Sequence, residues 1–499
     1  MKSFWLKSRF ALVLNILLLL TLIGLLLIPF ATNGMWYDDA IYVQTWDLLQ
    51  RFHLKLGFFS LNMVKLWLYG NSRLLLSFFP IYGFFYLFKG NTEISRLVDI
   101  SFVLINIATV IYLLRLVRIP WRSIGCFVLI LISLFQIRPC YDPIASYAVL
   151  FKLLAFAITI SLILLVKWQQ TGRTSYLAIS NLIILISLFC YELNILYYPI
   201  AVVTILTAPY AKRLKNLLIT ILPLVLYITC VCLIRSYNTN LYPGTTFGSL
   251  RGMPITYLKQ LVGSFPGSFY LMYGHNDYHF SVLIKALISS KIAWLIAALS
   301  LLCSYFIVGF QTNEKSHPEV SKGLIATALV FVVLTPFLIA FSLKYQLELM
   351  WGLPYLPVYY QYFGLALLLA LSLQRLMIKR QQLVLIVIVP LFSLYTTLNW
   401  ISNKNEMAKH ESFYTEPIHS LGRALDKGLL DVVRDGDILE LKDLPFYING
   451  NLFYRMAGKN LSIPSDMWVI KPRKDAICYQ LSGPVAGDKE SVWQLILKK

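Results

Sequence analysis

Two adjacent carboxylates stand just beyond the first apolar segment of the chain, in Trp36-Tyr37-Asp38-Asp39-Ala40. Like charges this close repel each other, so at least one of them needs a cation, a hydrogen-bond donor or a raised pKa. Partial removal from water can bring a carboxyl pKa toward the pH at which a general base works. Asp38 and Asp39 are therefore our candidate catalytic residues. The alternative is a solvated acid pair that caps a helix.

A second polar segment runs from Gln136 to Tyr147 and contains Arg138 and Asp142. Asp-Pro before an apolar run is an ordinary helix start, which explains Asp142 without any function. Arg138 has no such explanation, because a guanidinium at a membrane boundary is placed to meet an anionic lipid head or an acid. We expect both residues in a site for a phosphate-bearing substrate.

Glu192 ends an otherwise apolar hairpin. A carboxylate at that position costs free energy unless a partner pairs with it or water solvates it. Glu192 is therefore either a binding residue or a side chain that reaches interfacial water. The segment between Phe341 and Phe363 is rich in aromatic rings, which any membrane interface favours. The cation and the amide in this segment are better evidence of a binding site than the rings alone. Phosphates need cations, while sugars stack on aromatic rings. The candidates in this segment are Lys344, Tyr345, Gln346 and Tyr355.

The loop from Arg235 to Phe280 adds Arg251 to the candidate phosphate ligands. It also contains His275-x-Asp277-x-His279, but alternating residues share one face only in an extended strand. Seven Cys are scattered without metal-ligand spacing. The sequence therefore supports no particular cofactor or metal, and dependence on a divalent metal stays open.

The elements that position these residues have the composition of membrane-spanning helices. The 499 residues are 58% hydrophobic and 14% charged, and the mean hydropathy is +0.67. A soluble fold could not cover such a surface, since soluble domains are roughly one-quarter charged. We predict an α-helical polytopic membrane protein with about eleven spans. They are expected near residues 10–31, 97–115, 122–137, 147–166, 176–191, 193–210, 216–234, 284–308, 323–343, 357–374 and 382–400.

The charge pattern sets the orientation of these spans. Of the formal charge of +20, the part through Trp400 carries +19, from 30 Lys and Arg against 11 Asp and Glu. The predicted inner loops hold clusters such as Arg115, Arg118 and Arg122, which places the N-terminus in the cytoplasm. The acids gather at the opposite, outer face. Nucleic acid is not expected as a partner, because no basic soluble face is present.

Two segments lie outside the predicted membrane helices. The first outer loop, 32–96, contains another apolar stretch, 74–88. It is short for a span and contains Pro80 and Gly83, so we place it as a helix that lies at the outer interface or re-enters it. A true crossing there would invert the sidedness of every later span. From residue 401 to 499 the composition is that of a soluble protein. A helix over 411–427 and strands over 436–441, 467–470 and 476–481 predict a small α/β domain outside the membrane, after a transmembrane domain of residues 1–400.

Together these features resemble the GT-C superfamily of membrane glycosyltransferases, which use polyprenyl-phosphate sugars as donors. The likeness rests on the first helix leading into a long outer loop with Asp38-Asp39, on later outer loops with charged residues, and on the C-terminal outer domain. It implies that Asp38 or Asp39 deprotonates or orients the acceptor. By looser matches, it implies that Arg138 and Lys344 hold the donor phosphate.

Within the superfamily the chain looks most like bacterial enzymes that decorate O-antigen or other envelope glycans, with a glycan or lipid acceptor. This implies an inverting hexosyl transfer in the bacterial inner membrane, with membrane lipids as partners. There is no Trp-Trp-Asp motif, which speaks against protein N-glycosylation. The alternatives are a transporter or flippase of a lipid-linked glycan, and a polymerase or ligase. Acids gathered at one face, rather than along a midplane path, weigh against the transporter.

Overall fold

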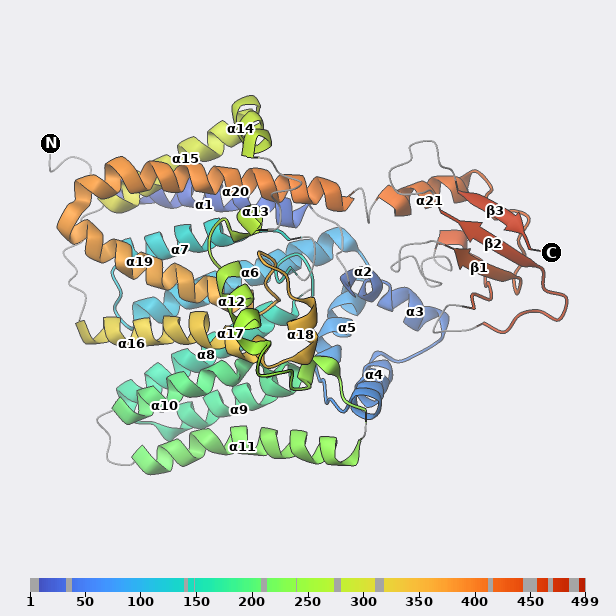
Figure 1. Ribbon diagram of the computed structural model, residues 1–499, viewed down its shortest axis with the longest axis horizontal. Helices are drawn as coiled ribbons and strands as arrows, with labels where there is room; N and C mark the ends of the chain where they lie inside the picture. Colours follow the sequence, from blue (N-terminus) through green and yellow to red (C-terminus); the bar gives the residue numbers. More distant parts are fainter. Residues whose placement is uncertain are drawn as a thin grey trace.

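The fold was taken from a computed structural model. The structure describes residues 9–32, 38–138, 142–147, 149–207, 213–238, 240–272, 280–309, 318–411, 416–442, 456–464, 470–483 and 493–498. Two parts are visible in Figure 1, a long helical bundle and a small C-terminal domain beside one end of it. This agrees with the predicted class, an α-helical polytopic membrane protein that carries a small C-terminal sheet.

Apolar runs form the bundle, and each expected span coincides with a helix or with consecutive helices. Seven helices are long and apolar enough to cross a membrane, and others in the described residues are shorter. The bundle helices are α1 (Arg9–Ala31), α6 (Thr92–Leu116), α7 (Trp121–Leu134), α8 (Leu150–Thr171), α9 (Thr174–Cys190), α10 (Tyr197–Thr207), α11 (Arg213–Tyr237), α15 (Lys291–Gly309), α16 (Pro318–Leu329), η4 (Val330–Leu334), α17 (Thr335–Ala340), α19 (Val358–Leu383), η5 (Val384–Ile388) and α20 (Val389–His410).

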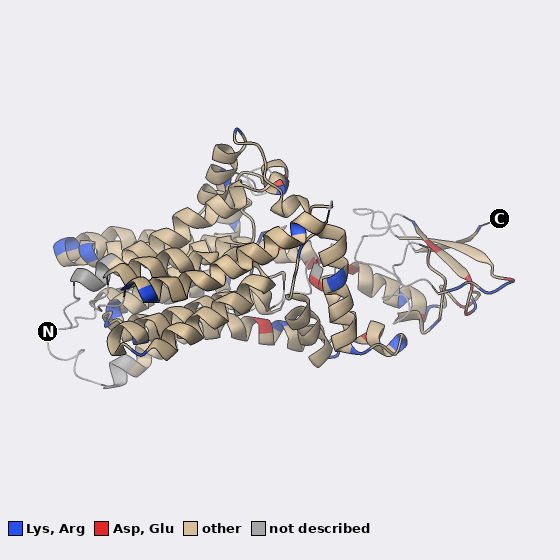
Figure 2. Cartoon of the chain, turned by 90° about the horizontal axis from the view of Figure 1, so that it is seen from below, with Lys and Arg blue, Asp and Glu red and all other residues tan. Residues whose placement is uncertain are grey.

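The bundle has two chemically different ends. At one end, Gln170 of α8 donates to the carbonyl of Leu116, and Gln381 donates to the carbonyl of Val308. Lys and Arg gather there (Figure 2), and we call it the basic end. The opposite end carries the C-terminal domain, and we call it the domain end. The described parts of the predicted inner loops lie at the basic end.

Short helices cover the domain end. The first long loop folds as α2 (Asp38–Tyr42), α3 (Thr45–Arg51), α4 (Leu56–Asn71) and α5 (Phe78–Leu87), and these helices share a small apolar core that includes Phe59, Phe78 and Tyr82. The predicted stretch 74–88 therefore contains a helix of only ten residues. The other short elements are η1 (Glu192–Leu196), η2 (Pro243–Thr245), α12 (Met253–Gly263), α13 (Ser268–Met272), α14 (Phe280–Ser289) and α18 (Leu343–Glu348).

The C-terminal domain contains α21 (Glu416–Asp426) and a three-stranded sheet. Strand β1 (Ile438–Lys442) pairs in parallel with β2 (Cys478–Ser482), which pairs antiparallel with β3 (Gln494–Leu497). Strands β1 and β2 match two predicted strands, whereas β3 was not predicted. The expected strand at 467–470 lies almost wholly outside the described residues. Helix α20 runs past residue 400 to His410, so a single helix crosses the expected domain boundary.

Candidate functional site

A cleft of about 250 Å³ opens among the short helices of the domain end. Its polar lining includes Arg73, which precedes α5, Glu192 at the start of η1, and Tyr345 on α18. Arg73 donates from Nε and Nη2 to the two carboxylate oxygens of Glu192, at 2.9 and 2.5 Å. Such a paired, planar contact is the geometry that guanidinium and carboxylate groups favour.

Aromatic rings surround this ion pair. The Arg73 guanidinium lies 5.2 Å from the ring centre of Tyr191 and 5.3 Å from that of Tyr242. Burial opposes the charge on Arg73, but Glu192 and the neighbouring tyrosines outweigh it and raise the Arg73 pKa. The cleft thus combines a permanent cation, a half-exposed carboxylate and ring faces, which suits a polar ligand such as a sugar.

The candidates on and beside α18 divide into two groups. Tyr345 and Tyr355 are buried, with ring centres 4.1 Å apart, and burial raises both hydroxyl pKa values well above the ordinary value. They therefore remain neutral hydrogen-bond donors. Lys344 donates to the Tyr242 hydroxyl at 3.2 Å and lies 3.8 Å from Glu348. The structure thus brings Glu192 and Tyr345 into one cleft, with Lys344 and Tyr355 beside it.

Gln346 and Arg251 have other surroundings. The Gln346 side chain bonds both backbone groups of Ser249 and the carbonyl of Ala340, so it fixes the loop before α12. A Cβ atom at Gly248 would lie 2.4 Å from this amide, which explains a glycine there. Arg251 is exposed on the same loop. Neither side chain lines the cleft.

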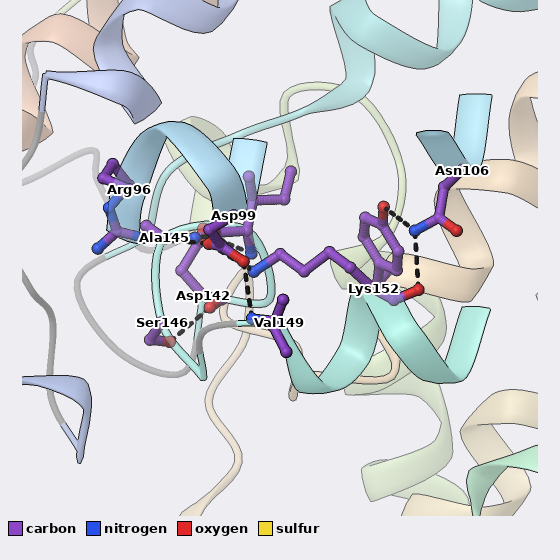
Figure 3. Close-up of polar contacts among 10 residues, drawn as sticks. Arg96, Asp99, Asn106, Asp142, Ala145, Ser146, Val149 and Lys152 are labelled. Atoms are coloured by element: carbon purple, nitrogen blue, oxygen red, sulfur yellow. Dashed lines mark hydrogen bonds and ion pairs between the residues drawn. The ribbon is translucent and has the colours of Figure 1, made fainter. Parts of the chain in front are cut away.

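A second polar group is buried between α6 and α8 (Figure 3). Asp99 of α6 accepts from Lys152 Nζ at 3.0 Å and from Arg96 at 3.3 Å through Oδ2, and from the Val149 amide at 2.7 Å through Oδ1. Lys152 also donates to the Ile144 carbonyl at 3.0 Å. All three charged side chains are at most 1% exposed. This cluster ties the loop 135–149 to the two helices.

Within that loop, Asp142 has a structural task. Its Oδ1 accepts from the amides of Ile144 and Ala145 at 2.8 and 2.7 Å, and its Oδ2 accepts from the Arg138 amide at 3.2 Å. Burial raises the Asp142 pKa, while the bond from Ala145 and the charge of Arg138 oppose that rise. Asp142 therefore shapes the turn that presents Arg138, rather than standing free for a substrate.

Arg138 is the cation that this loop carries. It is 1% exposed, and Nη2 donates to the Gly263 carbonyl at 2.9 Å. Its guanidinium lies 5.5 Å from the ring centre of Tyr362. Within the described part of the chain, the other two nitrogens, Nε and Nη1, make no hydrogen bond of acceptable geometry. A buried cation with two unused donors is costly unless an anion completes it.

The carboxylate pair lies on α2. Asp39 is fully buried, next to Ala40 and Val43, which pack into the core of the bundle. Asp38 is the first residue of α2, and the structure does not describe its side chain. His275, Asp277 and His279 lie outside them as well. Among the residues that the structure describes, no group of three His, Cys, Asp or Glu side chains is placed to hold a metal.

Sequence reasoning missed three charged residues that the structure places at the domain end, namely Arg73, Asp99 and Lys152. Arg73 is one of many charges in the long first loop, where spacing gives no partner. Lys152 did offer a signal, because it is a lone cation at the start of an apolar span. Such a residue is expected to be paired or functional, and its partner proved to be Asp99.

Comparison with known proteins gives one structural likeness. No family model matches the chain, and no curated protein matches it by sequence. Its structure is similar to the crystal structure of ArnT from Cupriavidus metallidurans bound to undecaprenyl phosphate, with 10% sequence identity and a TM-score of 0.49. The likeness covers 96% of this chain and 94% of that one.

Proposed function

We propose that this chain is a membrane glycosyltransferase of the GT-C type, which moves a sugar from a polyprenyl-phosphate donor to an envelope glycan or lipid. The observation that carries the proposal is Arg138, a fully buried guanidinium with two unused hydrogen-bond donors. Phosphate oxygens would supply the missing acceptors. Charge-assisted bonds of this kind are strongest where water is scarce.

An apolar cavity of about 320 Å³ supports a lipid as the carrier of that phosphate. It lies between α7, α15, α19 and α20, and its lining extends from Leu376 and Val308 near the basic end to Leu134 and Tyr395. Leu134, which lines the cavity at this end, is four residues before Arg138 in the chain. A long isoprenoid chain in this cavity would place its phosphate at Arg138.

The reaction that fits is an inverting displacement on the outer face of the membrane. An acceptor oxygen attacks the anomeric carbon of a hexosyl donor, and the bond from that carbon to the phosphate oxygen breaks. The lipid phosphate leaves with the electron pair, and Arg138 neutralises its growing charge without moving a proton. Asp39 or Asp38 takes the proton of the acceptor. The cleft with Arg73, Glu192 and Tyr345 would hold the sugar or the acceptor.

Purified chain in lipid vesicles, supplied with a polyprenyl-phosphate hexose and an extracted envelope acceptor, tests this proposal. Arg138→Ala is expected to lower turnover by roughly 10²–10³-fold, as loss of one oxyanion donor does. Arg138→Lys should recover donor binding in part, because the charge remains without the two-pronged geometry. Arg423→Ala, at an exposed arginine of the C-terminal domain, is the control. Unaltered donor affinity in both Arg138 variants would refute the assignment.

Asp39→Asn and Asp38→Asn test the proton acceptor in the same assay. At least one is expected to lose roughly 10²–10⁴-fold in turnover while donor binding persists, since general-base catalysis contributes about that much. Normal transfer by both variants would remove the base from α2. Movement of the lipid-linked sugar across the vesicle membrane without transfer would favour the flippase alternative instead.

A further inference from the structure

A partly open cavity of about 750 Å³ lies away from the domain end, among α6, α8, α10 and α16. Its walls are mainly aliphatic and include Leu113, Leu165, Ile200, Val203 and Leu324. The polar side chains in the wall are Gln169, Thr204 and Thr327, and the two threonines bond the carbonyls of their own helices. The volume falls within the roughly 300–1,000 Å³ of ligand sites, and close-packed interiors do not keep such a space empty.

Two basic residues adjoin lining residues of this cavity in the sequence. Val117 and Val166 line it, and Arg118 and Lys167 follow them directly in the sequence. Among the described residues at the basic end, cations outnumber acids. The cations include Arg118, Arg122, Arg173, Arg375, Lys379 and Arg380, while Glu319 lies in the first turn of α16. Figure 2 shows this concentration of positive charge. Anionic lipid heads are attracted to such a surface within about a Debye length.

We propose that this cavity binds an anionic glycerophospholipid of the leaflet at the basic end. One acyl chain would fill the space between α10 and α16, and the phosphate would lie by Arg118 and Lys167. An acyl chain fits because the wall is apolar and open to one side. An anionic head fits because cations outnumber acids at this end of the bundle. This site lies at the other end of the bundle from Arg138, so it does not depend on the proposed reaction.

Gly323 offers a direct test, because it lines the cavity and a Cβ atom added there would meet nothing within 4 Å. Gly323→Phe would therefore fill the cavity without a backbone clash. Gly309 is a matched control, since its Cβ also has open space, near the same end, but it does not line this cavity. Protein purified in mild detergent is analysed by native mass spectrometry, and its unfolding temperature is measured with added dioleoyl-phosphatidylglycerol or dioleoyl-phosphatidylcholine.

Wild type and Gly309→Phe are expected to retain an anionic phospholipid and to gain thermal stability with phosphatidylglycerol only. Gly323→Phe should lose both responses. If that variant fails to fold, Arg118→Glu with Lys167→Glu leaves the cavity intact and should weaken phosphatidylglycerol binding by on the order of tenfold or more. Equal responses to the two lipids, retention by both Gly variants, or a polyprenyl phosphate as the retained lipid would overturn the proposal.

Discussion

At the scale of single residues, the Asp99 cluster shows how a membrane protein keeps charges in its interior. Two cations and one backbone amide converge on one carboxylate, and all three charged side chains are buried. Burying charge is expensive, and the cost is offset only when every partner is present. The cluster also fixes Val149 and Ile144. The position of the loop that carries Arg138 therefore depends on a few polar contacts.

Asp99→Asn is expected to destabilise the protein by about 3–5 kcal/mol, because it removes the carboxylate charge from a buried ion cluster. Lys152→Met should cost less, since Arg96 still pairs with Asp99. The double variant should be more stable than the sum of the two losses predicts, because the residues are in contact. Unfolding in mixed detergent micelles measures all three.

The control for that series is Glu416→Gln, which breaks an exposed ion pair with Arg423. It should lower stability much less than either buried variant, because water already screens the exposed pair. Strictly additive losses at Asp99 and Lys152, or losses no larger than at Glu416, would contradict a coupled buried cluster.

At the scale of elements, α20 acts as the support of the second loop. Helix α7 ends at Leu134, and the backbone after it is extended. Two amides on one face of α20 satisfy that backbone. Asn399 donates to the carbonyls of Ser133 and Phe135, and Asn403 accepts from the Ile137 amide at 2.7 Å while donating to the Phe135 carbonyl. Arg138 directly follows Ile137 in the chain.

Asn403→Ala is expected to raise the donor KM with a smaller effect on kcat, because Arg138 loses its anchor one residue away. The lost buried bonds should also cost about 1–3 kcal/mol of stability. Ser393→Ala is the matched control on the same helix, since it removes only a bond to the Ala297 carbonyl. Steady-state kinetics on both variants decide the matter. Equal effects on KM would show that α20 does not position Arg138.

The same helix shows what sequence can and cannot predict. Apolar periodicity and length located α20 and the other long helices, because lipid selects for continuous apolar runs. The polar face of α20 was not recognised, since Asn and Ser inside a helix have meaning only when their partners are known. Those partners lie more than 260 positions away in the chain. Strand β3 was missed because four residues give too short a pattern.

The candidate site, like α20, could be predicted from the sequence only in part. Glu192 and Tyr345 were predicted from residue type and proximity to membrane ends, and the structure places them in one cleft. Arg73 could not be assigned to them from spacing, since it lies 119 residues from Glu192. Asp142 was expected to contact a substrate, yet its oxygens accept from backbone amides. Local turn geometry of that kind is not visible in a sequence.

At the scale of the whole molecule, the proposed reaction depends on which end faces the cytoplasm. The basic end carries the cations of the predicted inner loops, and positive loops favour the cytoplasmic side. The domain end, with Arg138, Arg73 and Asp39, would then face outward. Donor and acceptor would meet outside the cell membrane.

Single Cys residues in a Cys-free background test that orientation. Cys at Asp475, exposed in the C-terminal domain, should react with a membrane-impermeant maleimide in intact spheroplasts. Cys at Lys379, exposed at the basic end, should react only after permeabilisation. The reverse pattern would place the candidate site in the cytoplasm and separate it from an outer-face acceptor.

The central claim is that the chain transfers a sugar from a lipid phosphate, and glycan mass spectrometry tests it most directly. Envelope glycans and lipid-linked sugars are compared between cells with the gene, cells without it, and cells that express only Arg138→Ala. The account predicts that one hexose of defined mass is missing from an envelope glycan in the second and third strains, while its polyprenyl-phosphate donor accumulates on the outer side of the membrane. Identical glycans in all three strains, or a donor that accumulates only on the cytoplasmic side, would contradict the account.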